Sequence, residues 1–353
     1  MKARNRSRTR VRLQDVAAEA GVSVNTVSRA LTGKSDVSDR TRARVQKVAK
    51  QLGYTPNVLA RSLVQGATRT VGLIVSDCTA PYYAHLIREV ESVTTEAGFG
   101  LLLATSNDDV EKEQQALRIM RERCVDGILL TAVDVRAEHV ADVIGGTVPL
   151  VLLSRRPPGY RGPFVGADNV LGARMAVRRL VEAGHHRIAH LSRSDTPSSA
   201  RERAQGWRQE LRSHGLSADP ALLHRVPHTP EGGREAVQWL LGLEPRPSAV
   251  FTYSDVLAVG LLAGLREAGV DVPRDLSVVG FDDIALASIV TPPLTTIAQG
   301  IGEIGRRGAS ILIARLQGAR ESEETVVLAP RLIERGTVAA LGKRPRSPGL
   351  KAL

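Results

Sequence analysis

Residues 13–31 read LQDVAAEAGVSVNTVSRAL, two short amphipathic segments separated by a glycine. The first segment carries apolar residues at helical spacing, at Leu13, Val16, Ala17 and Ala20. Gly21 suits the tight left-handed turn that would follow this helix, and Ser23 is a natural N-cap for a second one. The small side chain at Ala17 allows two helices to cross closely. The stretch therefore predicts a helix-turn-helix.

The second helix is expected to bury Val27, Ala30 and Leu31 and to expose a small, polar and basic face. That face and its N-terminus comprise Ser23, Val24, Asn25, Thr26, Ser28 and Arg29. In the major groove Asn can pair with adenine and Arg with guanine, whereas Val can only touch a thymine methyl. We expect Val24, Asn25 and Arg29 to read bases, and the three hydroxyl residues to position the helix. A helical hairpin without DNA-binding function would not need such a face.

A third helix is predicted from about Thr41 to Leu52, ended by Gly53. Pro56 then breaks the chain direction, and Asn57 can cap a further short helix that reaches Leu63. This last segment is weakly apolar, so it would be marginally stable in isolation.

The charge of the chain is concentrated at its N-terminal end. The net charge is +11, and residues 1–69 contain 15 Lys and Arg against four Asp and Glu. The other 284 residues carry 33 charges of each sign. A neutral body with a basic head is typical of a nucleic-acid-binding protein. Residues 1–12, in which basic and polar residues alternate, are expected to form a disordered basic arm.

From residue 70 the pattern changes to alternating apolar strands and helices, which predicts an α/β body with parallel sheets. Strands are expected at TVGLIVSD, FGLLLATS, DGILLTA, PLVLLS and FVGA, and the alternation starts again after Asp168. Two successive runs of this kind suggest two similar lobes.

The segments DVAAEAGVSVNTVSRAL, VSDRTRARVQKVAKQLGYTPN and ARSL resemble the lactose/galactose repressor (LacI/GalR) family, and the resemblance continues to about residue 337. It implies that the second helix lies in the major groove and that residues 57–63 form a hinge helix ordered on the operator. Asn57, Ala60 and Leu63 would then contact DNA, with Leu63 wedged into the minor groove. It also implies a periplasmic-binding-protein-like body whose lobes are crossed near 167–170, 297–301 and 327–330, with helix 302–317 returning to the first lobe.

Ligands of open parallel sheets bind beyond the carboxyl ends of the strands, which here carry carboxylate, guanidinium and hydroxyl groups. Such a mixture suits a polyhydroxylated ligand. The resemblance places effector-binding groups at Arg203 and Asp282. The full expected effector set is Tyr82, Tyr83, Asn107, Ser154, Arg203, Ser254, Phe281 and Asp282.

Some of these positions leave alternatives open. Many family members have Asn where Ser254 stands and Asp where Ser154 stands, so the ligand can differ from a simple hexose. Asp255 and Asp283 precede helical segments and could be N-caps only, and Phe281 could be plain core.

The predicted domains are the arm 1–12, a DNA-binding domain at 13–56, a hinge and linker at 57–69, a body at 70–337 and a disordered tail at 338–353. A pseudo-palindromic operator and a homodimer are expected, because one head makes too few base contacts for specificity. The tail has no leucine heptads, so a tetramer is not expected.

Several other functions are disfavoured by the sequence. With two cysteines, no apolar run of membrane-spanning length and no signal peptide, we expect a cytoplasmic protein without membrane association. No cofactor or metal site is expected: G300-I-G-E-I-G305 fits a dinucleotide fingerprint but lies late in the chain. His185 and His186 follow Gly184 at a helix end, where imidazolium would favour the helix dipole.

A transport-type binding protein sharing the body would need a signal peptide and no basic head. A sugar-processing enzyme would need a catalytic base and nucleophile, or a metal set, at the strand ends. We therefore expect a non-enzymatic transcriptional regulator, most simply a repressor controlled by a sugar or sugar derivative. The effector, the operator and the sign of the response stay open at this point.

Overall fold

The computed structural model describes residues 11–32, 34, 36–54, 66–133, 148–194, 197–319 and 325–341. The chain forms two compact units, Met1–Thr68 and Arg69–Leu353, called here the head and the body. Residues 1–10 of the predicted arm, the hinge positions Asn57, Ala60 and Leu63, and residues 342–353 of the predicted tail lie outside the described residues.

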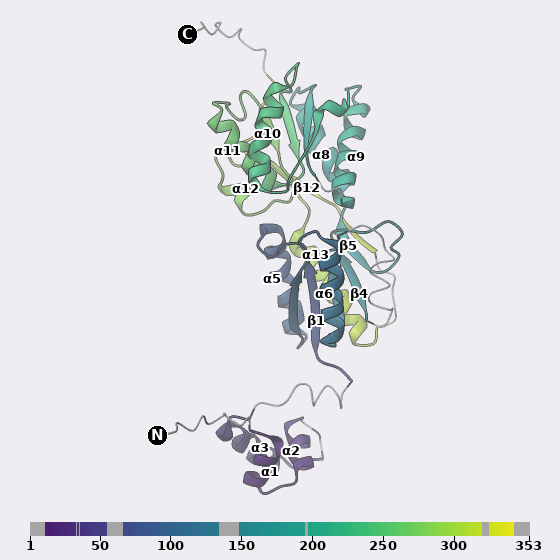
Figure 1. Ribbon diagram of the computed structural model, residues 1–353, viewed down its shortest axis with the longest axis vertical. Coiled ribbons are helices and arrows are strands. Elements are labelled where there is room, and N and C mark those ends of the chain that lie inside the picture. The colour runs from purple at the N-terminus through teal and green to yellow at the C-terminus, as the bar shows by residue number, and fades with distance from the viewer. Residues whose placement is uncertain are drawn as a thin grey trace. The chain divides into compact units, whose positions relative to one another are not determined.

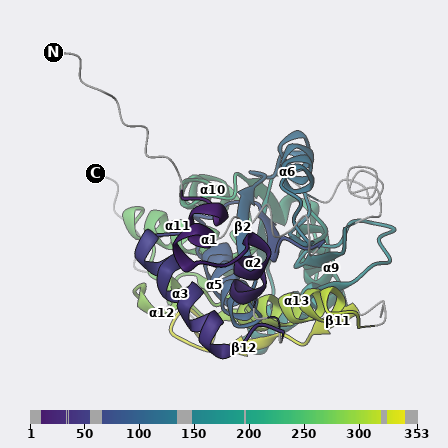
Figure 2. The same ribbon diagram turned by 90° about the horizontal axis from the view of Figure 1, so that it is seen from below.

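The head contains the predicted helix-turn-helix, with helices α1 Leu13–Ala20, α2 Val24–Leu31 and α3 Asp39–Leu52 (Figures 1 and 2). Gly21 makes the turn after α1 with φ 63°, a left-handed conformation that glycine adopts without strain. All three helices contribute small apolar side chains to one core: Val16, Ala17, Ala20, Val27, Ala30, Val37, Val45, Val48 and Ala49. Helix α3 begins two residues before the predicted start, because Ser38 caps it by accepting from the Thr41 amide at 3.3 Å.

The first lobe of the body is a six-stranded parallel sheet in the order β11-β5-β4-β3-β1-β2. Its strands are β1 Thr70–Val75, β2 Gly100–Thr105, β3 Gly127–Leu130, β4 Leu150–Leu153, β5 Phe164–Ala167 and β11 Thr325–Leu328. Side chains alternate across β1, so Val71 and Leu73 face one core while Ile74 faces the other. Helices α5 Pro81–Glu96 and α13 Ile301–Leu316 pack in the first core, and α6 Val110–Glu122 packs in the second.

The second lobe is a four-stranded parallel sheet in the order β7-β6-β8-β9. Its strands are β6 Ile188–Arg193, β7 Leu223–Val226, β8 Ala249–Thr252 and β9 Ser277–Val279. Two helix pairs cover it (Figure 1), α8 Asn169–Glu182 with α9 Ser198–Ser213 and α10 Pro230–Gly242 with α11 Asp255–Glu267. Shorter elements are η1 Pro220–Leu222, α12 Leu286–Ile289 and the antiparallel pair β10 Thr296–Ala298 and β12 Arg331–Ile333.

The chain passes between the lobes after β5, after β10 and after β11, which confirms the three predicted crossings. Two crossings are joined directly, because the Asp168 amide donates to the Leu328 carbonyl at 3.0 Å. The third crossing leads into α13, which lies with the elements of the first lobe in Figure 1 although it comes late in the sequence. The predicted α/β class with a helical head and a two-lobed body of parallel sheets is therefore correct.

The glycines of G300-I-G-E-I-G305 serve helix packing. Gly300 adopts φ 77° immediately before α13, and a Cβ on Gly305 would lie 3.0 Å from the Leu86 carbonyl oxygen of α5. Close contact between α13 and α5 thus accounts for a motif that resembles a dinucleotide fingerprint.

The expected role of His185 as a cation at a helix end is wrong. Its ring is buried and bonds the Ser248 and Ser277 hydroxyls at 2.9 and 3.0 Å, and burial lowers its pKa. Neutral His185 instead ties the end of the described chain, through the Ala339 carbonyl at 3.2 Å, to the second lobe.

Candidate DNA-binding face and effector site

The exposed face of α2 carries the residues expected to read DNA. Val24 is 41% exposed at the first position of the helix, and Asn25 beside it is exposed as well. Ser23 caps the helix, because its Oγ accepts from the Thr26 amide at 3.1 Å and shares a hydrogen bond with the Thr26 Oγ1 at 2.8 Å. Ser28 is half-buried one turn further on. The helix therefore presents apolar and amide side chains first, with a fixed N-terminus.

Arg29 does not project freely, because it forms an ion pair with Asp36. Both side chains are about half exposed, at 46% and 47%. The loop that carries Asp36 is anchored to α3, since Arg42 Nη2 donates to the Lys34 carbonyl at 2.8 Å and to the Val37 carbonyl at 3.2 Å. The sequence did not indicate this pair, because Asp36 lies beyond the helix in a loop.

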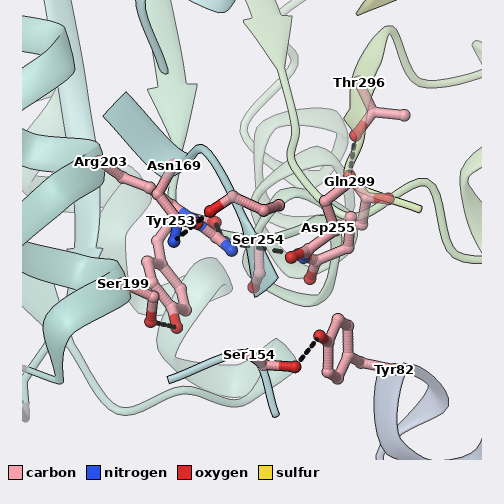
Figure 3. Close-up of polar contacts among 12 residues, drawn as sticks. Tyr82, Ser154, Asn169, Ser199, Arg203, Tyr253, Ser254, Asp255, Thr296 and Gln299 are labelled. Carbon is pink, nitrogen blue, oxygen red and sulfur yellow. Dashed lines mark hydrogen bonds and ion pairs between the residues drawn. The ribbon is translucent and has the colours of Figure 1, made fainter. Parts of the chain in front are cut away.

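The effector candidates meet in a small cavity between the lobes, the inner cavity, with a volume of about 40 Å³. From the first lobe it is lined by Ala80, Tyr82, Tyr83, Ser154 and Arg155, and from the second lobe and the crossings by Ser199, Arg203, His228, Tyr253, Val256, Asp282 and Gln299. Figure 3 shows several of these side chains converging from different elements.

Arg203 is the most heavily engaged side chain of the inner cavity. It is 4% exposed, and its Nε donates to Asn169 Oδ1 at 2.9 Å while its Nη1 donates to the Tyr253 carbonyl at 2.5 Å. Its guanidinium carbon lies 3.6 Å from the centroid of the Phe281 ring and 4.5 Å from that of Tyr253. The second terminal nitrogen, Nη2, has no hydrogen-bond partner among the described residues, so it is a donor available to a ligand.

Asp282 faces Arg203 across the inner cavity at 3.4 Å and accepts from Gln299 Nε2 at 2.6 Å. Burial raises the pKa of Asp282 to about 6, although Arg203 and Gln299 oppose the shift. Behind it, buried Asp255 accepts from Thr296 Oγ1 at 2.5 Å and from the Ile284 amide at 3.0 Å (Figure 3). Burial first and the nearby Asp282 second raise the Asp255 pKa well above its usual range.

The first lobe contributes a hydroxyl pair, because the Tyr82 and Ser154 oxygens are 2.5 Å apart (Figure 3). Burial raises the pKa of the Tyr82 hydroxyl, so it stays a neutral donor or acceptor. Ser154 has φ 65° and Asp282 has φ 119°. Backbone held in such sparsely populated regions is concentrated at functional sites, where the surrounding structure over-determines it.

A buried ion-pair cluster joins the lobes next to this cavity. Asp108 accepts from Arg155 Nη1 at 2.5 Å within the first lobe and from Arg193 Nη2 of the second lobe at 2.7 Å. Both arginines are at most 5% exposed, and their charges hold the pKa of Asp108 far below its usual range against the effect of burial. The loop that presents Asp108 is left-handed at two successive residues, with φ 49° at Asn107 and 56° at Asp108.

A second and larger cavity, the outer cavity, has a volume of about 690 Å³. It adjoins the inner one across four residues that line both: Ala80, Tyr83, His228 and Val256. Asn107, Asp108 and Arg193 line only the outer cavity. Its volume falls in the usual range of ligand-binding pockets, roughly 300–1,000 Å³.

The structure brings together five of the eight expected effector residues in the inner cavity: Tyr82, Tyr83, Ser154, Arg203 and Asp282. It places Asn107 in the outer cavity. Ser254 and Phe281 lie behind the wall, both fully buried. Ser254 is the N-cap of α11, accepting from the Leu257 amide at 3.3 Å, and Phe281 supports Arg203. Of the two proposed caps, Asp255 is the first helical residue and Asp283 pairs with Arg335 at 2.6 Å.

Three cavity residues escape the sequence analysis: His228, Tyr253 and Gln299. Tyr253 ends an apolar strand pattern, and Gln299 lies in a predicted crossing, so both carried a positional signal. His228 follows β7, and the pattern predicts no strand there because His224 and Arg225 interrupt the apolar run. Its Nε2 is 2.8 Å from the Ser254 hydroxyl, and burial lowers its pKa to about 3.

Two further searches concern only the described ranges. No group of three or more His, Cys, Asp or Glu among them could hold a metal ion. No helix there is long and apolar enough to cross a membrane.

Family models match both parts of the chain. That of bacterial regulatory proteins of the lacI family matches residues 12–57, and that of the periplasmic binding protein-like domain matches residues 177–338. The chain is 35% identical over 341 residues to the HTH-type transcriptional repressor CytR of Escherichia coli K12, which covers 97% of this chain and all of the relative. It is 33% identical over 330 residues to the ribose operon repressor of Haemophilus influenzae, covering 93% and 99%.

Solved structures agree with these relatives. The lac repressor dimer bound to operator and the anti-inducer ONPF superposes with a TM-score of 0.86 at 27% identity, covering 94% of this chain and 100% of that one. A complex of the transcriptional regulator CelR with cellobiose has a TM-score of 0.69 at 35% identity, covering 93% and 100%. The helix-turn-helix head, the two-lobed body and similarity over nearly the whole length show that the chain belongs to the LacI family of DNA-binding transcriptional regulators.

Proposed function

We propose that this protein is a transcriptional repressor that binds a pseudo-palindromic operator as a homodimer and changes its operator affinity when a sugar or sugar derivative binds between its lobes. The observation that carries the proposal is the inner cavity, which both lobes line with groups suited to hydroxyl ligands. CytR and the ribose operon repressor are named as repressors, and the CelR structure holds a sugar.

The chemistry of the inner cavity supports a polyhydroxylated ligand. Arg203 offers a free donor, Asp282 and Gln299 offer a carboxylate and an amide, and the Tyr82–Ser154 pair can exchange its own hydrogen bond for one to a ligand. Sugar hydroxyls both donate and accept, so they can bridge such groups, and charge-assisted hydrogen bonds of this kind are the strong ones. The rings of Tyr83 and Tyr253 add apolar area for a sugar face.

Recognition of DNA is proposed to rest on Val24, Asn25 and Arg29, with Ser23, Thr26 and Ser28 in positioning roles. The capping bonds of Ser23 and Thr26 support the second role, because they fix the end of the helix that would approach the phosphates. Arg29 would exchange Asp36 for a base edge on binding. Asn57, Ala60 and Leu63 are proposed to contact DNA as a hinge.

Coupling needs only a differential affinity of the ligand for one arrangement of the lobes, which typically shifts a second site by about 1–3 kcal/mol. Arg203 and Asp282 belong to the second lobe, while Tyr82 and Ser154 belong to the first. A ligand held by both sets therefore biases the lobe arrangement, and with it the way two hinges meet in the dimer. The same linkage serves an inducer or a corepressor.

Two measurements test the proposal. A thermal-shift screen of sugars, nucleosides and purines should raise the melting temperature with a sugar or sugar derivative; stabilisation by purines alone would contradict the ligand class. Fluorescence anisotropy with DNA from upstream of the gene should show salt-sensitive binding. Arg29→Ala should weaken binding by about 1–3 kcal/mol and relax preference at one base pair. An equal loss on every sequence would reduce Arg29 to a phosphate contact.

A further inference from the structure

The two adjoining cavities differ in how much room they leave. The inner cavity, at about 40 Å³, holds little more than one water molecule, whose share of liquid volume is about 30 Å³. Its side chains already bond one another, as in the Tyr82–Ser154 and Gln299–Asp282 contacts. The outer cavity, at about 690 Å³, exceeds what one sugar ring fills. A single ring bound at Arg203 and Asp282 would therefore leave most of the space between the lobes empty.

The outer cavity has its own polar groups, drawn from both lobes. Asn107 and Asp77 come from the strand ends of the first lobe, and Glu231 from the first turn of α10 in the second. Asp77 uses only Oδ1 within the chain, accepting from the amide and hydroxyl of Thr79 at 2.8 and 2.7 Å. Its Oδ2 and the Asn107 amide have no hydrogen-bond partner among the described residues, so they are available to a ligand.

The wall between the cavities is narrow and partly aromatic. Tyr83 and His228 line both cavities, and the His228 ring is fixed by the Ser254 hydroxyl and by edge contact with Tyr253 at 5.3 Å between ring centroids. A ligand can pass from one cavity to the other along these two rings, with its polar groups directed to either side.

We propose that the outer cavity is a second binding subsite and that the effector has two linked units, a sugar unit at Arg203 and Asp282 and a second polyhydroxylated unit between Asn107 and Glu231, as in a disaccharide. This inference rests on the proposed function of the inner cavity as a sugar site. Because Asn107 and Glu231 belong to different lobes, the second unit adds contacts across the gap and favours one lobe arrangement more strongly than the first unit alone.

The test is calorimetric titration of the full chain with cellobiose, maltose, lactose, trehalose and sucrose, and with glucose, galactose and fructose. At least one disaccharide should bind 10-fold or more tightly than its component sugars. Glu231→Ala should lower that ratio about 5-fold, and so should Asn107→Gly, which removes the amide while allowing the left-handed backbone. Glu235→Ala, an exposed glutamate on the same helix that lines neither cavity, is the matched control and should keep the ratio.

The outcomes separate the two proposals. If monosaccharides bind as tightly as every disaccharide that contains them, or if the ratio survives both outer-cavity substitutions, the second subsite is wrong while the sugar site stands. If no sugar of either set binds, both the subsite and the sugar site are overturned.

Discussion

Arg29 of the head and Arg203 of the body each pair with an aspartate, but in opposite surroundings. The Arg29–Asp36 pair is about half exposed and can open at small cost, since water replaces its partner. The Arg203–Asp282 pair is almost fully buried, backed by two aromatic rings and two further hydrogen bonds. An arginine that must meet varied DNA is held loosely, whereas one that must receive a single kind of ligand is held in advance of binding. The difference predicts a series of unequal responses to substitution.

The largest effect is expected at the buried pair. Arg203→Ala leaves the Asp282 carboxylate buried without its cation and should lower the free energy of unfolding by about 3–5 kcal/mol. Urea denaturation followed by tryptophan fluorescence measures it, because Trp207 and Trp239 both lie in the body. Arg212→Ala removes the same charge from the exposed end of α9 and should change little. Equal losses in the two variants would contradict the view that Arg203 is held by its buried partners.

The two buried aspartates of the cleft should respond to pH with opposite signs. Asp282 has its pKa raised to about 6 in the folded state, so folding takes up a proton and its contribution to stability is lost as pH rises from about 4 to 6. Asp108 has its pKa lowered, so its contribution is lost as pH falls below about 4. Each slope can reach about 1.4 kcal/mol per pH unit.

Urea denaturation between pH 3 and 7 checks this pair of signs. Asp282→Asn should remove the fall in stability above pH 4, and Asp108→Asn should reduce the loss below pH 4. The assignment is wrong if both variants change the pH profile in the same direction.

A smaller effect is expected at the support of Arg203. A Cβ on Gly172 would lie 2.8 Å from two atoms of the Phe281 ring, and the ring holds the guanidinium. Overpacking costs about 1–3 kcal/mol, while alanine gains about 0.8–1 kcal/mol in a helix, so Gly172→Ala should lose about 1 kcal/mol net. Gly242→Ala, in a helix with nothing within 4 Å of the added carbon, should be neutral or stabilising. A stabilised Gly172→Ala would show that Phe281 is free to shift.

The smallest effect is expected in the head. Asp36→Asn should change stability by less than about 0.5 kcal/mol, because exposed ion pairs contribute little. The same substitution frees Arg29 and should tighten operator binding modestly in fluorescence anisotropy. A large stability loss would mean that the pair holds the loop after α2 and is not merely a resting contact.

Sequence patterns predicted the regular parts of this molecule well because those parts depend on local periodicity. Val16, Ala17 and Ala20 mark the buried face of α1, and Gly21 marks its end. The alternating strands and helices likewise gave the two lobes and their crossings. In the cleft, position along a strand was enough to bring five expected residues into one cavity.

What the sequence missed depends on contacts between distant segments. Asp108 meets Arg193 across 85 positions of sequence, and Asp282 meets Gln299 through a crossing. Ser254 stands next to the cavity in sequence but is turned inward, because α11 needs its hydroxyl as a cap. No local pattern separates a polar side chain that faces a ligand from one that satisfies a helix end.

The central claim is that a ligand bound at Arg203 between the lobes controls operator affinity. The most direct test is to titrate the sugar identified by the thermal-shift screen into the protein–operator complex, with fluorescence anisotropy as the readout. The account predicts a 5- to 150-fold change in operator affinity for the wild type and for Arg212→Ala. It predicts little or no change for Arg203→Ala, and a reduced change for Tyr82→Phe, which lacks only the cavity hydroxyl. A normal ligand response in folded Arg203→Ala protein would contradict it.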